Sequence, residues 1–265
     1  MKAYFGEASV QAISLSLGRY LIKKLCKNVH KNPENEYLER PDCGRTVPLV
    51  RAQWLFAPVF LILCMSCGSS NQLSVSEPKA FISVQSRWSS TLIEVCWERG
   101  SEMFSRERVW LRQKVEAEFE EKTTLRFVGW NLCQSQTDGI RIGVSDKVGS
   151  VPHTKGLGRD LSGVSFGMVL NFTFKNWGRS CLSNVRKCVE SIGVHEFGHA
   201  VGLAHEQNRS DTPATCLSYK QGASGDQEVG SWDLQSIMNY CNPVYNNGGY
   251  LSKGDIRGIE LLYSR

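Results

Sequence analysis

The most informative stretch of the chain is HEFGHAVGLAH, residues 195–205. Because an α-helix has about 3.6 residues per turn, His195 and His199 are expected to project from one helical face, where both can bind one metal ion. Glu196 follows the first of these histidines and can reach a water molecule on the metal. The spacing therefore predicts a helical metal site with a carboxylate beside it.

The end of the same stretch supplies a third ligand. Gly202 can adopt a positive φ, so the helix can stop there and the chain can turn. The turn brings His205 back towards the other two histidines. Three protein ligands leave the fourth position of a zinc ion open for water, which is typical of a catalytic zinc site rather than a closed structural one. We therefore expect His195, His199 and His205 to hold Zn²⁺.

A second motif follows downstream, SIMNY at residues 236–240. Together with the zinc motif it resembles the Met-turn of the metzincin zinc peptidases, and the flanking residues 232–235 and 205–209 are similar to the astacin subfamily. Asn239 differs from the histidine that astacins typically carry there. The resemblance covers roughly the last 185 residues, the size of one domain.

The resemblance implies an α+β fold. Its sheet is twisted and mostly parallel with one antiparallel edge strand, and it carries an active-site helix and a C-terminal helix. The amphipathic stretch 103–122 predicts a helix, and 125–130 and 140–144 predict strands. We expect a glycine-rich loop at 149–163, the zinc helix at 182–203 and a final helix at 251–263 that Ser252 and Asp255 cap. Residues 164–174 alternate apolar side chains, and the family plan would make them the edge strand.

The function that the resemblance implies is zinc endopeptidase activity on protein or peptide substrates. Glu196 would act as general base towards a zinc-bound water. Tyr240 matches the astacin tyrosine that binds zinc and then hydrogen-bonds the oxyanion, and Met238 is the structural methionine of the turn. Two alternatives stay open: a matrixin-like peptidase whose Tyr240 is inert, and a zinc-stabilised surface adhesin without activity. The intact Glu196 argues against the adhesin.

The astacin resemblance raises a question about Glu206, because the matching glutamate in astacins meets the amino terminus of the mature enzyme. In this chain Glu206 could instead pair with Arg209.

The apolar run at 54–65, preceded by Arg51, is too short for a membrane span of about 20 residues and is typical of a signal-peptide core. Cys67 follows a small residue and precedes a Gly/Ser-rich stretch, so 51–67 resembles a bacterial lipoprotein signal. We expect export with a lipid anchor to the membrane on Cys67, or otherwise secretion. Residues 1–50 are a leader of uncertain role, 68–78 a tether, and 79–265 the peptidase domain.

Charge and cysteine content support this division. Residues 68–265 hold 22 Lys and Arg against 21 Asp and Glu, a net charge of +1, so nothing indicates a nucleic-acid partner. Six cysteines follow Cys67, and an even number in an exported domain predicts disulfides. Their pairing is open, although the short spacing of Cys181 and Cys188 suggests one pair.

Overall fold

A computed structural model describes residues 79–177 and 179–263 of the 265-residue chain. The expectations for the leader, the signal at 51–67, the lipid anchor at Cys67 and the tether at 68–78 lie outside the described residues. Within the described ranges, no helix combines the length and the apolar character that crossing a bilayer requires.

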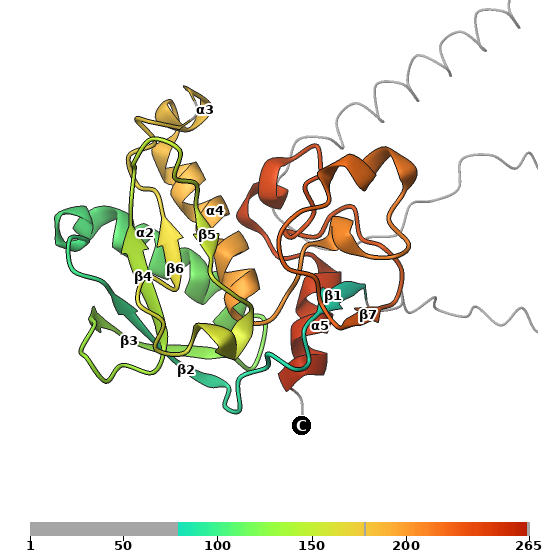
Figure 1. Ribbon diagram of the computed structural model, residues 1–265, viewed down its shortest axis with the longest axis horizontal. Coiled ribbons are helices and arrows are strands. Elements are labelled where there is room, and N and C mark those ends of the chain that lie inside the picture. The colour runs from blue at the N-terminus through green and yellow to red at the C-terminus, as the bar shows by residue number, and fades with distance from the viewer. Residues whose placement is uncertain (1–78, 178, 264–265) are drawn as a thin grey trace, which may run out of the picture. The chain divides into compact units, whose positions relative to one another are not determined.

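A five-stranded sheet occupies the left side of the fold as drawn in Figure 1. Its strand order is β3-β2-β4-β6-β5, and every neighbouring pair is parallel except β5 with β6. The strands are β2 (Leu92–Trp97), β3 (Arg126–Leu132), β4 (Ile140–Val144), β5 (His153–Thr154) and β6 (Met168–Leu170). The fold is thus a mixed α/β arrangement with a mostly parallel sheet, and its antiparallel edge strand is β5.

Helix α4 (Val185–Ala200) packs against α2 (Ser105–Val115) and against β6. Aromatic side chains fill the space between these helices and the sheet. The Phe197 ring of α4 lies 5.1 Å from Phe127 and 5.7 Å from Trp130, and Phe119 lies 5.9 Å from Phe127. Such offset aromatic contacts add to the free energy gained by burial, so the helix that carries the zinc motif is fixed along its apolar face.

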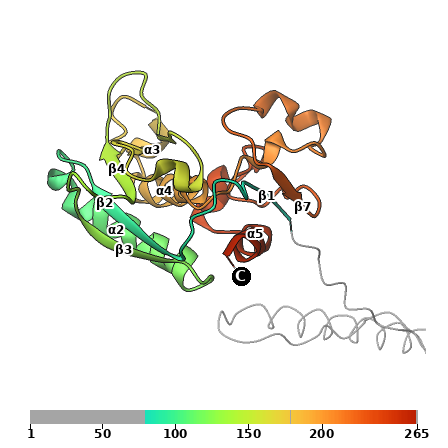
Figure 2. The same cartoon turned by 60° about the horizontal axis from the view of Figure 1, so that its bottom comes forward.

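The segment after α4 is mostly irregular, and its strand β7 (Gln227–Val229) forms a second, two-stranded sheet with β1 (Ala80–Ile82). These two strands pair antiparallel, and the C-terminal helix α5 (Lys253–Tyr263) packs on β1 (Figure 2). The remaining elements are short: α3 (Arg179–Leu182), a π-helical turn (Glu116–Glu120) and 3₁₀ turns at Glu102–Phe104, Gly158–Leu161, Glu206–Asn208, Ala214–Tyr219 and Tyr245–Gly249.

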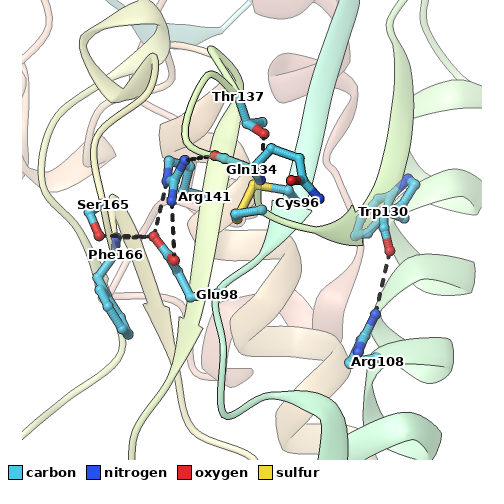
Figure 3. The surroundings of a disulfide bond; sticks show 10 residues. Cys96, Glu98, Arg108, Trp130, Gln134, Thr137, Arg141, Ser165 and Phe166 are labelled. Atoms are coloured by element: carbon cyan, nitrogen blue, oxygen red, sulfur yellow. Dashed lines mark hydrogen bonds and ion pairs between the residues drawn. A yellow bond between two sulfur atoms is a disulfide. The ribbon is translucent and has the colours of Figure 1, made fainter.

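All six cysteines of the described residues form disulfides, Cys96–Cys133, Cys181–Cys188 and Cys216–Cys241. The predicted pair Cys181–Cys188 is confirmed; it joins α3 to α4. Cys96–Cys133 joins the end of β2 to the segment after β3, close to the buried Glu98 (Figure 3). Disulfides persist in oxidising compartments, which agrees with an extracellular protein.

The expected edge strand at 164–174 is wrong. Only Met168–Leu170 forms a strand, and it lies inside the sheet between β4 and β5. The alternation breaks because Phe166 and Phe174 adopt left-handed backbone angles, φ 50° and 54°. The side chain of Asn171 also accepts hydrogen bonds from the backbone N–H of Thr173 and Phe174, which makes a turn. The edge strand β5 lies instead in the segment expected to be loop.

The helix boundaries are largely as predicted. Helix α4 starts three residues later than expected because Asn184 caps it, accepting a hydrogen bond from Lys187 N–H. At α5, Ser252 Oγ accepts from Asp255 N–H and Asp255 Oδ2 accepts from Ser252 N–H, which is the predicted reciprocal cap. Strand β2 was not predicted, although it lies inside the sheet and pairs with both β3 and β4.

Candidate metal centre

Helix α4 ends inside the motif at residues 195–205, as the sequence predicts. Gly202 has φ 100°, and its N–H donates to His199 O while Leu203 N–H donates to Gly198 O. These two bonds form a Schellman motif, which ends a helix and reverses the chain. The chain then runs beside β1, with Ala204 N–H donating to Phe81 O. This path brings His205 back to the helix face.

The three histidines converge at their Nε2 atoms. His205 Nε2 lies 3.1 Å from His199 Nε2 and 3.3 Å from His195 Nε2, and all three residues are buried. Each Nδ1 lies 2.8–2.9 Å from a backbone carbonyl: Ile237 O for His195, Leu203 O for His199 and Gln221 O for His205. A carbonyl can only accept, so each Nδ1 carries the proton and each Nε2 presents a lone pair.

This donor set fits a cation. Burial lowers the pKa of all three imidazoles, that of His195 to about 3, so the rings are neutral at physiological pH. Neutral Nε2 atoms without protons cannot hydrogen-bond to one another, and three lone pairs at this separation repel unless a positive charge lies between them. Imidazole nitrogen is a preferred zinc ligand, and an Nδ1–H bond to a carbonyl is the usual way its ring is oriented.

The turn around Met238 accepts hydrogen bonds from His195 and from Glu206, the neighbour of His205. The Ile237 carbonyl orients His195, while the Met238 carbonyl accepts from Glu206 N–H, next to His205. A Cβ atom at Gly198 would come within 2.5 Å of the Met238 sulfur, so glycine is needed where the helix crosses the turn. Met238 therefore packs directly against α4.

Glu196 is the one carboxylate of the motif. It is 4% exposed and its Oε2 atom has no hydrogen-bond partner among the described residues. Burial raises the pKa of Glu196 to about 8. Unpaired buried carboxylates are costly and need an explanation such as a catalytic role or an absent water or ion. Glu196 and Tyr240 line the same cavity of about 360 Å³ as His199 and His205, so the carboxylate faces accessible space.

Tyr240 stacks on the histidine group. Its ring lies 5.3 Å from that of His195 at an interplanar angle of 16°, and its hydroxyl oxygen is 3.4 Å from His195 Nε2. The Tyr240 backbone is fixed by an N–H bond to the Gln207 side chain. The hydroxyl therefore lies beside His195 Nε2, within reach of an ion that this nitrogen binds.

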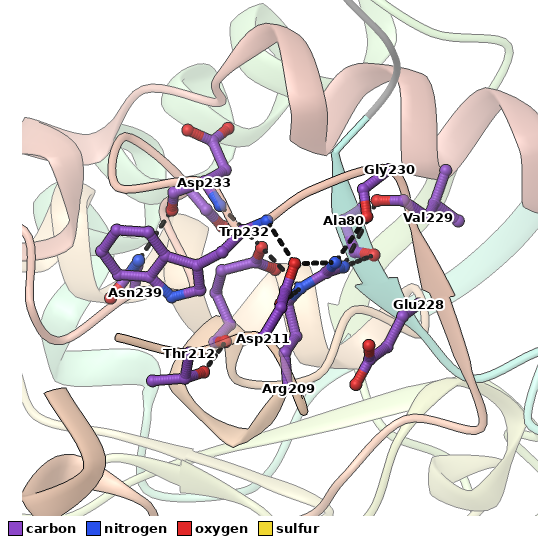
Figure 4. A network of polar contacts seen from close by, with 12 residues as sticks. Ala80, Arg209, Asp211, Thr212, Glu228, Val229, Gly230, Trp232, Asp233 and Asn239 are labelled. Carbon is purple, nitrogen blue, oxygen red and sulfur yellow. Dashed lines mark hydrogen bonds and ion pairs between the residues drawn. The ribbon is translucent and has the colours of Figure 1, made fainter. Parts of the chain in front are cut away.

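The suggested pairing of Glu206 with Arg209 is confirmed. The Arg209 Nε atom lies 3.4 Å from Glu206 Oε1, and both side chains are 1% exposed. Figure 4 shows Arg209 surrounded by the carbonyls of Ala80, Val229 and Gly230 and by the Asp211 carboxylate. Arg209 thus ties the segment after His205 to the β1–β7 sheet.

Sequence reasoning missed the residue that anchors the Met238 turn. Asp255 was expected only as a helix cap. Its carboxylate also accepts from Ser236 Oγ–H at 2.6 Å and from Ile237 N–H at 2.9 Å. Asp255 therefore holds the carbonyl-bearing turn that orients His195. Its capping pattern was visible in sequence, but the contact across 18 or 19 residues was not.

No protein-family model and no curated protein matches the chain. Among solved structures, the chain is similar to a structure of myroilysin, with 21% identity and a TM-score of 0.49, covering 69% of this chain and 98% of that one. A crystal structure of myroilysin gives 17% identity and a TM-score of 0.46, covering 68% and 86%. At these values the function must be argued from the chain's own residues.

Proposed function

We propose that the chain is a zinc endopeptidase of the astacin-like type. The observation that carries this proposal is the convergence of three deprotonated Nε2 atoms next to a buried, unpaired carboxylate on an open cavity. Catalytic zinc sites need three protein ligands, an accessible fourth position and a neighbouring base. His195, His199 and His205 would hold the ion, and substrates would be proteins or peptides.

The chain's own residues supply the remaining chemistry. When bound, the zinc ion would polarise the scissile carbonyl and lower the pKa of a water molecule towards neutrality. Glu196 takes the proton from this water as the water attacks the carbonyl carbon. After the C–N bond breaks, Glu196 passes that proton to the leaving amine. A zinc ion beside Glu196 would favour the ionised form of this carboxylate, which is the form that can take a proton.

Tyr240 is proposed to donate a hydrogen bond from its hydroxyl to the carbonyl oxygen as negative charge develops on that oxygen. Tyr240→Phe should therefore lower kcat by about 10- to 1,000-fold with a smaller change in KM. Steady-state kinetics on one peptide measure this. An unchanged kcat would favour the alternative in which the site is matrixin-like and Tyr240 only packs.

A fluorogenic peptide assay tests the peptidase proposal against the adhesin alternative. Purified protein should cleave the peptide, lose the activity in a chelator and regain it when zinc is added back. A protein that binds zinc yet cleaves none of a diverse peptide set would support the zinc-stabilised adhesin.

We further propose that residues 51–67 direct export and that Cys67 carries a lipid, so the domain would be held at a membrane surface. A fatty-acid analogue supplied to the native host should label the wild-type protein and not the Cys67→Ser variant. Label that persists in the variant would show that another residue carries the lipid. An unlabelled wild-type protein would indicate secretion without a lipid anchor.

A further inference from the structure

A second cavity of about 440 Å³ adjoins the first one at the metal centre. His195, Glu196 and Tyr240 line it at one end. We call the rest of it the aromatic pocket, because its walls include Trp177, Tyr219 and Tyr245, together with Ile192 and Asn246. Three segments far apart in sequence supply these aromatic walls: the turn after β6, the end of the 3₁₀ turn Ala214–Tyr219, and the start of Tyr245–Gly249.

The aromatic pocket is apolar and partly open. Trp177, Tyr219 and Tyr245 are 38%, 48% and 53% exposed, although large aromatic side chains usually bury most of their surface. Exposed apolar surface that gathers in one hollow marks a binding site. Trp177 and Tyr245 also line a further cavity of about 560 Å³, so the hollow continues beyond the pocket and can take a long side chain.

Charge is nearly absent from this lining. Among the described residues, no lysine, arginine or aspartate lines the pocket, and its one glutamate is Glu196, which the proposed mechanism uses. A charged substrate side chain that entered would lose hydration without gaining an opposite charge.

We propose that the aromatic pocket selects a large apolar side chain, aromatic or long aliphatic, on a residue that flanks the bond to be cut. This inference rests on the proposed peptidase function. The pocket shares Glu196 and Tyr240 with the cavity at the metal centre. An extended peptide advances only about 3.3 Å per residue. A side chain entering the pocket therefore belongs to a residue next to the scissile bond, and Trp177 and Tyr219 determine its identity.

The test uses full-length, zinc-loaded protein and a set of quenched peptides that differ at the residue before or after the cut bond. Mass spectrometry identifies the bond cut. At one of the two positions Phe, Tyr, Leu and Met should exceed Ala in kcat/KM by about 10- to 200-fold, the range that an apolar pocket provides. Peptides with Asp at that position should be cut more slowly than peptides with Ala there.

Two variants of pocket residues and one control variant test whether the aromatic pocket causes the preference. Tyr219→Ala should lower the ratio of kcat/KM for the Phe peptide to kcat/KM for the Ala peptide by about 2- to 12-fold, because one aromatic contact is lost. If the Tyr219→Ala protein does not fold, Trp177→Ala is used for the same test. Tyr250→Ala is the matched control, since Tyr250 is 57% exposed and lines neither this pocket nor the cavity at the metal centre. It should leave the ratio unchanged.

The outcomes distinguish a failure of this inference from a failure of the proposed peptidase function. Cleavage of the set without a preference at either flanking position would overturn the pocket proposal and leave the peptidase intact. A preference for Arg or Lys would also overturn it, and would indicate recognition of a cation by the aromatic faces. No cleavage of any peptide by zinc-loaded protein would overturn the proposed function and, with it, the inference.

Discussion

Glu196→Gln should lower peptide hydrolysis by about 10²- to 10⁴-fold, the contribution expected of a general base. Glutamine has nearly the same size as glutamate but cannot take a proton from water. The three histidines are oriented by carbonyls of Ile237, Leu203 and Gln221, and none of these contacts involves Glu196. The variant should therefore keep its zinc, so that the rate falls while the metal content does not.

The matched control is Glu190→Gln, on the same helix. Glu190 pairs with Arg186 at the helix surface, one turn and a half before Glu196 along the chain. Its loss should leave the rate near that of wild type. A Glu196→Gln protein that hydrolyses peptide at a near-native rate would contradict the proposed mechanism, and one that loses zinc would show that Glu196 holds the ion instead.

Arg209→Leu should destabilise the fold by about 3–5 kcal/mol. The guanidinium donates to the carbonyls of Ala80, Val229 and Gly230 and to both oxygens of Asp211. Its removal would break these five hydrogen bonds, and Glu206 would be a buried carboxylate without its cation. Total stabilities are commonly about 5–15 kcal/mol, so this is a large share.

Denaturant unfolding with excess zinc measures this change. Arg257→Leu is the control, because the Arg257–Glu260 pair is exposed and its loss should shift the unfolding free energy by at most about 1 kcal/mol. Arg209→Lys should fall in between, since lysine restores the charge but not the planar fork that reaches several acceptors. An Arg209→Leu protein as stable as the Arg257→Leu control would mean that the buried network does not stabilise the fold.

Features that depend on near neighbours in sequence were predictable. The positions of His195 and His199 follow from helical spacing, the reversal at Gly202 follows from its free backbone, and the cap of α5 follows from Ser252 and Asp255. In each case the interacting groups lie within a few residues, so chain geometry alone limits the possible arrangements.

Features that depend on distant contacts were not predictable. The run 164–174 alternates like a strand, but it is broken at Phe166, whose N–H donates to the Glu98 carboxylate 68 residues away. The edge strand β5 has two residues, too few for any periodic signal. The aromatic pocket could not be found either, because Trp177, Tyr219 and Tyr245 are brought together only by the complete fold.

Zinc content tests the central claim most directly. Wild-type protein, exchanged into metal-free buffer after zinc loading, should retain about one zinc ion per chain by elemental analysis. His199→Ala should retain little, because one of three ligands is gone. His153→Ala, which removes an exposed histidine outside the group, should retain the wild-type amount. Equal zinc in the His199→Ala and wild-type proteins, or none in the wild type, would contradict the assignment of His195, His199 and His205 as a metal site.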